Sequence, residues 1–144
     1  MDGSRQVVRV KVGEAPIDTS ALIDEVGRPD SGATVLFIGT VRDHSPGKEA
    51  VTHLDYEVYA EQVAPKIREI IDEAARQWPI LSVVVEHRSG AVTLGEASVA
   101  VAVSTAHRSD AFAAARFLID ELKTRAPIWK KEHWPGGAEW SQGS

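Results

Sequence analysis

The sequence contains no cysteine. Disulfide bonds, thiolate nucleophiles and metal sites with cysteine ligands are therefore excluded. No apolar run approaches the roughly 20 residues that a membrane-spanning helix needs, and the first residues, Met1–Gln6, lack the apolar core of a signal peptide. We therefore expect a cytoplasmic protein. If the chain takes part in sulfur chemistry, the sulfur must arrive on another molecule.

Several common active-site motifs are also missing. The chain has no Gly-x-Ser-x-Gly turn for a serine nucleophile, no Gly-x-Gly-x-x-Gly fingerprint and no P-loop. Its histidines show no close ligand pair on a helix, so no metal site is expected; they are His44, His53, His87, His107 and His133. The net charge of −5 argues against a general nucleic-acid binder, because such proteins usually carry a basic surface.

The remaining composition is that of an ordinary soluble domain. The chain has 144 residues, of which 43% are hydrophobic and 26% charged, which leaves room for one substantial core. There is no internal repeat, low-complexity segment or linker. Residues 1–144 are therefore expected to form a single domain, with residues 1–5 and 141–144 as flexible ends.

Alternating or continuous apolar patterns predict seven strands, at residues 6–12, 33–42, 51–59, 80–87, 96–105, 128–131 and 138–141. The segment Ala33–Arg42 is almost continuously apolar, which predicts a central strand, and Gly39 within it indicates a bulge or a close backbone approach. In the strand at 51–59, His53 and Asp55 are predicted to face away from the apolar side. The strand-dominated order favours an α+β fold over a doubly wound sheet.

Three helices are predicted. A short one begins near residues 17–20, which offer capping side chains, and is stopped by Gly27 and Pro29. The longest covers residues 61–77, where Pro65 is acceptable only within the first turn. The third has Ser109 as its expected N-cap, buries a stripe that includes Phe112 and ends before a proline.

His107 and Arg108 stand just before the third predicted helix. At such a position free backbone N–H groups and the helix dipole favour an anion, and the arginine adds a forked donor. The pair therefore predicts a phosphate or carboxylate site. An ordinary surface His–Arg pair is equally compatible with the sequence.

Two lysines stand on either side of the turn at Pro127, Lys123 at the end of the helix and Lys130 in the next strand. A chain that turns back here can bring both ammonium groups into one pocket, where a crowded lysine has a lowered pKa and can exchange protons. Alternatively, Lys123 is a helix-end residue favoured by the dipole and Lys130 a surface residue. Arg42, beside a predicted mobile loop at 43–50, has the same ambiguity.

Five segments together closely resemble the large, catalytic subunit of molybdopterin synthase. They are Phe-Ile-Gly-Thr-Val-Arg (37–42), His-Leu-Asp-Tyr-Glu-Val-Tyr (53–59), Glu-His-Arg-Ser-Gly (86–90), Thr-Ala-His-Arg-Ser-Asp-Ala-Phe (105–112) and Leu-Lys-Thr-Arg-Ala-Pro-Ile-Trp-Lys-Lys-Glu (122–132). The match runs in order from about Gly32 to Trp140, and its last segment is the most specific part. The resemblance implies an α+β, α/β-hammerhead-like domain with a mostly antiparallel sheet and about three helices.

The resemblance also implies a reaction. Family members are sulfurtransferases of molybdenum cofactor biosynthesis that convert cyclic pyranopterin monophosphate into molybdopterin. The sulfur comes from the C-terminal Gly-Gly thiocarboxylate of a small ubiquitin-like subunit, so no cofactor is expected in this chain. Two large subunits form a homodimer with a small subunit at each end, a heterotetramer whose pocket can borrow residues across the dimer. Cationic residues suit both the cyclic phosphate and the anionic tail.

By motif, Lys123 and Lys130 are the implied catalytic pair. Lys123 would lie nearest the terminal carbonyl of the small subunit and act in proton transfer and charge stabilisation. Lys130 would stabilise the opening phosphate ring and a hemithioester-like intermediate. The residues expected to contact substrate are Thr40, Val41, Arg42, His107, Arg108, Lys123, Lys130, Lys131 and Glu132. A non-catalytic anion- or nucleotide-binding module with the same cationic pocket is the alternative.

Overall fold

The computed structural model of the chain describes residues 6–45 and 47–143. The predicted flexible residues 1–5 and residue 144 lie outside this part. The elements follow in the order β1 (Val8–Gly13), α1 (Thr19–Val26), β2 (Ala33–Thr40), β3 (His53–Val58), α2 (Ala60–Gln77), β4 (Ile80–Arg88), β5 (Gly90–Thr93), β6 (Ala97–Thr105), α3 (Arg108–Arg125), β7 (Ile128–Trp134) and β8 (Gly137–Gln142). Every strand pair is antiparallel except β1 with β4. The predicted α+β domain with three helices is confirmed.

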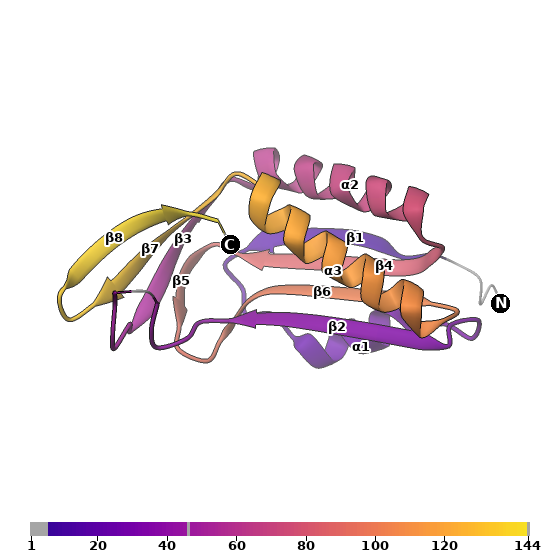
Figure 1. Ribbon diagram of the computed structural model, residues 1–144, viewed down its shortest axis with the longest axis horizontal. Coiled ribbons are helices and arrows are strands. Elements are labelled where there is room, and N and C mark those ends of the chain that lie inside the picture. Colours follow the sequence, from indigo (N-terminus) through magenta and orange to yellow (C-terminus); the bar gives the residue numbers. More distant parts are fainter. Residues whose placement is uncertain (1–5, 46, 144) are drawn as a thin grey trace.

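The first sheet has the strand order β1-β4-β6-β2 and carries helices on both faces (Figure 1). Because successive strand residues point to opposite faces, the two central strands supply two cores. Val83, Val85 and Val101 pack with α2 and α3, whereas Val84 and Ala102 pack with α1. The near-continuous apolar sequence of β4 and β6 is therefore explained by burial on both sides.

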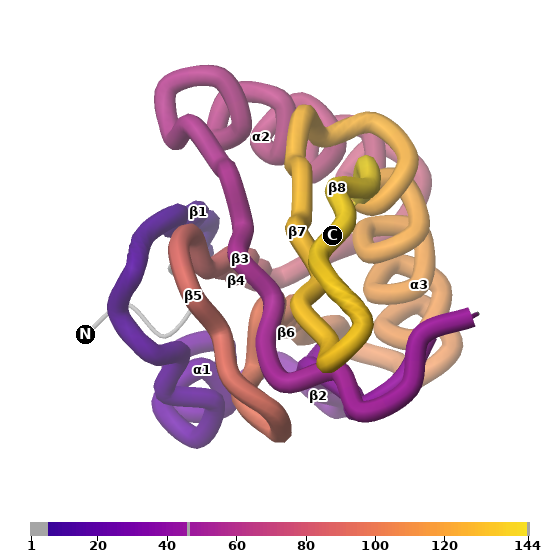
Figure 2. Tube along the Cα trace, turned by 90° about the vertical axis from the view of Figure 1, so that its left-hand side faces the viewer, coloured from indigo at the N-terminus to yellow at the C-terminus, as the bar shows by residue number. Residues whose placement is uncertain are grey.

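The second sheet, of order β5-β3-β7-β8, lies at one end of the first and faces the viewer in Figure 2. Its alternation matches the prediction, since Leu54 and Tyr56 are buried while His53 and Asp55 are half-buried on the other face. β5 was not predicted, because its four residues directly follow a turn signal. β8 confirms the strand predicted at 138–141 and extends to Gln142, which was expected to belong to a flexible end.

β2 was predicted to be central, but it lies at the edge of the first sheet and pairs only with β6. Its apolar residues are explained by the helices instead, since α3 and α1 both contact the strand. The predicted irregularity at Gly39 is confirmed: the pairing register shifts between Gly39 and Thr40, and a Cβ at Gly39 would lie 2.7 Å from Cγ1 of Val99. The irregularity therefore lies at the end of β2, just before the segment that leads to Arg42.

Two helices differ from their predictions in detail. α2 carries Pro65 in its second turn rather than its first. The proline costs roughly 3 kcal/mol, and burial of four branched side chains, at about 1.5–3 kcal/mol each, outweighs it; they are Val63, Ile67, Ile70 and Ile71. α3 begins at Arg108 after an extended His107, so Ser109 is a first-turn residue and not the cap.

Phe112 of α3 was predicted to face the core, but it is 64% exposed. The buried stripe runs through Ala111, Ala114, Ala115, Leu118, Ile119 and Leu122, and Phe112 lies about 100° around the helix from the first of these. The aromatic ring therefore stands on the surface. Within the described residues, no helix has the length and apolar character to cross a membrane.

Candidate functional site

The end of α3 that leads into β7 lies beside the junction of the two sheets (Figure 1). Residues from both sheets and from this end of α3 line a cavity of about 490 Å³. Its wall is built from the ends of β2 and α3, from β3, β6, β7 and β8, and from the loop between β2 and β3. Segments distant in sequence thus converge on one hollow, which contains Arg42, Lys123 and Lys130 as predicted.

Cations dominate the wall of this pocket. Arg42, Lys48, Lys123 and Lys130 line it against a single lining carboxylate, Glu132, in the part of the chain that the structure describes. The ammonium of Lys48 lies 3.1 Å from Oε1 of Glu132, so that carboxylate is already neutralised. The pocket therefore keeps an excess of positive charge, which suits an anionic ligand.

Lys123 lies in the last turn of α3, with part of its side chain still exposed. Partial burial lowers the pKa of its ammonium, and the positive charges of Lys130 and Arg42 lower it further, against a smaller opposing effect of Asp120. A lysine with a lowered pKa loses and regains its proton more readily near neutral pH. The crowding predicted from the sequence is therefore present.

The basic residues of β7 point to opposite faces of the second sheet. Lys130 and Glu132 face the pocket, and Lys130 is the register partner of Tyr56 on β3. Lys131, between them, does not line this pocket, and its ammonium lies 5.7 Å from the ring centroid of Trp140. Because alternate strand residues point to opposite sides, Lys131 faces away from this pocket, and its expected contact with substrate stays a prediction.

Thr40 lines the pocket, but Val41 does not. The Val41 side chain is buried, its N–H donates to the carbonyl of Glu96 at 3.1 Å, and its own carbonyl accepts from Gly95 at 2.9 Å. Val41 therefore fixes the chain between Thr40 and Arg42 instead of lining the pocket. Its expected contact with substrate, partly through backbone groups, stays a prediction.

His107 and Arg108 lie at the opposite end of α3 from Lys123, about 22 Å away at 1.5 Å per helical residue. They line a separate hollow together with Gly32 and Ser109. A single copy of the chain therefore does not place them in the lysine pocket, contrary to the expectation of one shared cluster. Sequence order alone could not show this, because a helix separates its ends by its full length.

Some pocket residues had no signal in the sequence. Lys48 comes from the loop, and beyond Glu132 it also pairs with Glu139 of β8 at 3.2 Å. His44 lines the wall from the same loop, where its Nδ1 lies 2.8 Å from a carboxylate oxygen of Asp43. Tyr56 was predicted to face inward, but nothing in its segment indicated a pocket. Tyr56 is placed by the pairing of β3 with β7, and Lys48 by its ion pairs with Glu132 and Glu139.

Beneath the pocket lies His87, which is 1% exposed. Its ring meets Tyr56 edge-on at 5.0 Å between centroids, and its Nδ1–H donates to the carbonyl oxygen of Arg88 at 2.7 Å. Burial lowers the pKa of His87 to about 4, and the charge of Lys123 also lowers it. The imidazole is therefore neutral at neutral pH and adds no charge beneath the lysines.

The buried histidine predicts an acid-sensitive stability. In the unfolded chain its pKa returns to about 6.5, so between pH 6.5 and about 4 the unfolded state binds a proton that the folded state does not. The stability present above pH 6.5 is lost as the pH falls to 4, by about 3 kcal/mol. Urea unfolding across this range should show a smaller loss for His87→Gln than for the unsubstituted chain. Equal losses in both would contradict the assignment, and His44→Gln is the exposed control.

Comparisons of the sequence and of the fold with known proteins all point to the same family. The sequence pattern of the family described as MoaE protein matches residues 12–125. The chain is 49% identical over 123 residues to the molybdopterin synthase catalytic subunit of Thermoplasma volcanium, covering 85% of this chain and 89% of that protein. The crystal structure of molybdopterin synthase from Staphylococcus aureus superposes with a TM-score of 0.85 at 33% identity, over 91% and 95% of the two chains. The fold also matches a complex of subunits 1 and 2 of molybdopterin-converting factor from Helicobacter pylori, with a TM-score of 0.75 at 20% identity over 92% and 89%.

Proposed function

Since the chain belongs to the MoaE family, the catalytic subunits of molybdopterin synthase, we propose that its lysine pocket inserts sulfur into cyclic pyranopterin monophosphate. The chain is an enzyme of molybdenum cofactor biosynthesis. The observation that carries the proposal is the cavity shared by Lys123, Lys130 and Arg42. Both reactants are anionic, one through a cyclic phosphate and the other through a thiocarboxylate.

The two lysines have different roles in the proposed reaction. The lowered pKa of Lys123 suits proton transfer at the terminal carbonyl of the sulfur carrier. Lys130 lies across the pocket on β7 and stabilises negative charge on the opening phosphate ring and on the intermediate. Arg42 adds a planar, forked donor that suits phosphate. Glu132, held by Lys48, limits the positive charge on the β7 side.

The sulfur carrier in this proposal is a small ubiquitin-like subunit ending in Gly-Gly. The Helicobacter pylori protein of the same fold was solved as a complex of two subunits. An extended tail is narrow enough to enter a cavity of about 490 Å³, and its thiocarboxylate is drawn by the cationic wall. We expect a stable complex at micromolar concentrations between this chain and such a subunit.

Two copies of the chain complete the site. His107 and Arg108 lie too far from the lysines of their own copy, so in this proposal they reach the pocket of a second copy. The surface beside them is apolar: Phe112 is 64% exposed and Ile38 37% exposed, next to a groove between β2 and α3. Exposed apolar patches of this kind mark interfaces. We place the contact between the large subunits here.

Phe112→Glu should weaken self-association at least tenfold, because it places a charge in an apolar contact. Stability of the single copy should change by no more than about 0.5 kcal/mol, since the side chain is exposed. Sedimentation equilibrium measures the first quantity and urea unfolding the second. Leu94→Glu, at a 47% exposed residue between β5 and β6, is the control. An unchanged dimer in Phe112→Glu would contradict this placement.

A reconstituted reaction tests the function. The purified chain is mixed with the thiocarboxylated small subunit and cyclic pyranopterin monophosphate, and molybdopterin is measured after oxidation to a fluorescent pterin. We expect two thiocarboxylates to be consumed for each molybdopterin, because the dithiolene holds two sulfur atoms. Binding of both reactants without any conversion would instead support the anion-binding alternative.

A further inference from the structure

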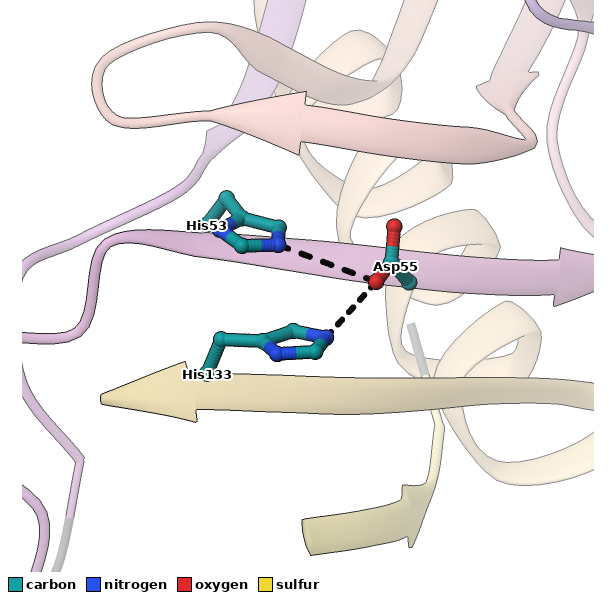
Figure 3. A group of neighbouring side chains, drawn as sticks. All are labelled: His53, Asp55 and His133. Carbon is teal, nitrogen blue, oxygen red and sulfur yellow. Dashed lines mark hydrogen bonds and ion pairs between the residues drawn. The ribbon is translucent and has the colours of Figure 1, made fainter. Parts of the chain in front are cut away.

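The outer face of the second sheet carries a group of side chains that the sulfur-transfer reaction does not use. His53 and Asp55 come from β3 and His133 comes from β7, and all three point to one spot away from the lysine pocket (Figure 3). His53 and His133 are direct register partners, and Asp55 is the next residue on the same face of β3. One potential ligand atom from each side chain lies within 4.8 Å of the other two. We propose that these three side chains form a binding site for a divalent late transition metal, with Zn²⁺ as the best fit.

The distances suit a single ion. Nε2 of His133 lies 2.6 Å from Oδ2 of Asp55, and Nε2 of His53 lies 3.7 Å from the same oxygen. Zinc binds imidazole nitrogen and carboxylate oxygen at about 2.0–2.2 Å. Two ligand atoms of a tetrahedral site are therefore about 3.4 Å apart, a value between the two distances. The imidazole rings are stacked, with centroids 4.2 Å apart and planes at 11°. One ring must therefore turn about its side-chain bonds before both Nε2 lone pairs point at a shared ion.

A hydrogen bond behind His53 orients its ring toward the site. The Thr52 hydroxyl donates to the carbonyl oxygen of His133 at 3.3 Å, so its oxygen can accept the Nδ1–H of His53 at 3.1 Å. In this tautomer the lone pair of Nε2 points toward the carboxylate oxygen of Asp55, 3.7 Å away, so both atoms are available to a cation. Support of this kind, in which the second ring nitrogen binds a neighbouring oxygen, is typical of zinc-ligating histidine.

The surroundings leave room for a cation. Lys131, the register partner of Asp55, places its ammonium near the ring of Trp140, 5.7 Å from the centroid. The three ligand side chains are 27–39% exposed, so water can complete the coordination as it does in open zinc sites. Two imidazoles and one carboxylate favour zinc and its neighbours over Mg²⁺ or Ca²⁺, which prefer oxygen ligands.

Metal binding would fasten β3 to β7. On entry, Zn²⁺ takes the place of the proton between His133 and Asp55, and that proton moves to Nδ1 of the same ring or to water. The opposite face of this strand pair carries Tyr56 and Lys130 of the pocket. The bound ion would therefore hold the strand that presents Lys130. The proposal departs from the sequence-based expectation of no metal site, which considered ligand spacing on helices and not pairing across strands.

Calorimetric titration of the untagged full chain with zinc chloride tests the site. We expect one Zn²⁺ per chain, and at least roughly tenfold weaker binding in each of His53→Gln, Asp55→Asn and His133→Gln. His44→Gln removes an exposed histidine that also lies beside an aspartate, and this control should keep full affinity. Because metal binding requires neutral imidazole, the affinity should also fall on acidification.

A second measurement keeps the test independent of catalysis. Zinc should raise the melting temperature of the unsubstituted chain and leave that of His133→Gln unchanged, because only the folded state holds the site. Circular dichroism without metal checks that each variant folds, as expected for half-exposed side chains. Absence of zinc binding up to millimolar concentration, or unchanged affinity in His133→Gln, would overturn the proposal. Neither outcome would affect the assignment of the lysine pocket.

Discussion

Lys123→Ala is expected to lower the rate of molybdopterin formation by about 10³-fold, the loss typical of removing a proton-transfer group that also stabilises charge. The ammonium is lost from a pocket that it shares with Lys130 and Arg42. The variant should still bind the small subunit, because Lys123→Ala leaves the surface outside the pocket unchanged. Single-turnover assays with the thiocarboxylated small subunit measure the rate, and calorimetry measures the complex.

Stability separates this catalytic role from a structural one. Lys123 is repelled by two neighbouring cations, which together with partial burial lower its pKa. Its removal should therefore leave the free energy of unfolding unchanged or slightly raised, although a helix-end cation is normally favourable by about 0.3–1 kcal/mol. Lys66→Ala on α2, at a lysine paired with Glu69, is the matched control and should keep full activity. A Lys123→Ala chain with normal turnover would rule out the assigned role.

Lys130→Ala should lower turnover by about 10²- to 10³-fold, because charge that develops on the phosphate ring and the intermediate loses its stabilising group. Removing this cation should also raise the pKa of Lys123, since Lys130 contributes to its depression. The pH dependence of the residual reaction should therefore move to higher pH. Initial rates over a pH series in Lys130→Ala and the unsubstituted enzyme measure both effects.

Lys131→Ala provides the comparison for Lys130→Ala. The two lysines are neighbours in sequence, but Lys131 lies on the other face of β7 near Trp140. Its replacement should change turnover by no more than about threefold, a difference of roughly 0.6 kcal/mol in activation free energy. Equal losses in the two variants would mean that general charge, and not position in the pocket, carries the effect.

The sequence predicts the local elements because each depends on neighbouring residues. Alternation along residues 51–59 correctly separates Leu54 and Tyr56 from His53 and Asp55. The turn at Pro127 correctly places Lys123 and Lys130 in one pocket, since a helix end and the following strand start remain close in space. Gly39 correctly indicates an irregularity, because a side chain there would collide with Val99.

The incorrect predictions concern features that depend on distant parts of the chain. An apolar strand can be central, or it can lie at an edge of the sheet and be covered by helices. The two cases differ in the number of neighbouring strands, and in the described residues β2 has one, β6. α3 holds His107 and Arg108 at its other end from Lys123, so their contact with substrate stays a prediction that requires a second copy of the chain. The approach of His53 to His133 depends on strand register, since 80 residues separate them in the chain.

The lysine pocket brings like charges together, which is unfavourable for stability but useful for binding an anion. Burial and the nearby charges of Lys130 and Arg42 lower the pKa of Lys123, in a pocket that four cations line against one carboxylate. Such an arrangement is unfavourable without an anion and favourable with one. The surrounding parts of the fold are conventional, with apolar strands packed between helices. The repulsion between these positive charges therefore arises at the place where anionic reactants are expected to bind.

A crystal structure of this chain with the small subunit would show where the tail ends. We expect the terminal Gly-Gly to enter the cavity, with its terminal carbonyl within hydrogen-bonding distance of Nζ of Lys123 and with Lys130 and Arg42 on the same wall. A tail that ends elsewhere on the surface, with the lysine pocket closed to it in every subunit arrangement, would exclude the proposed reaction at this pocket.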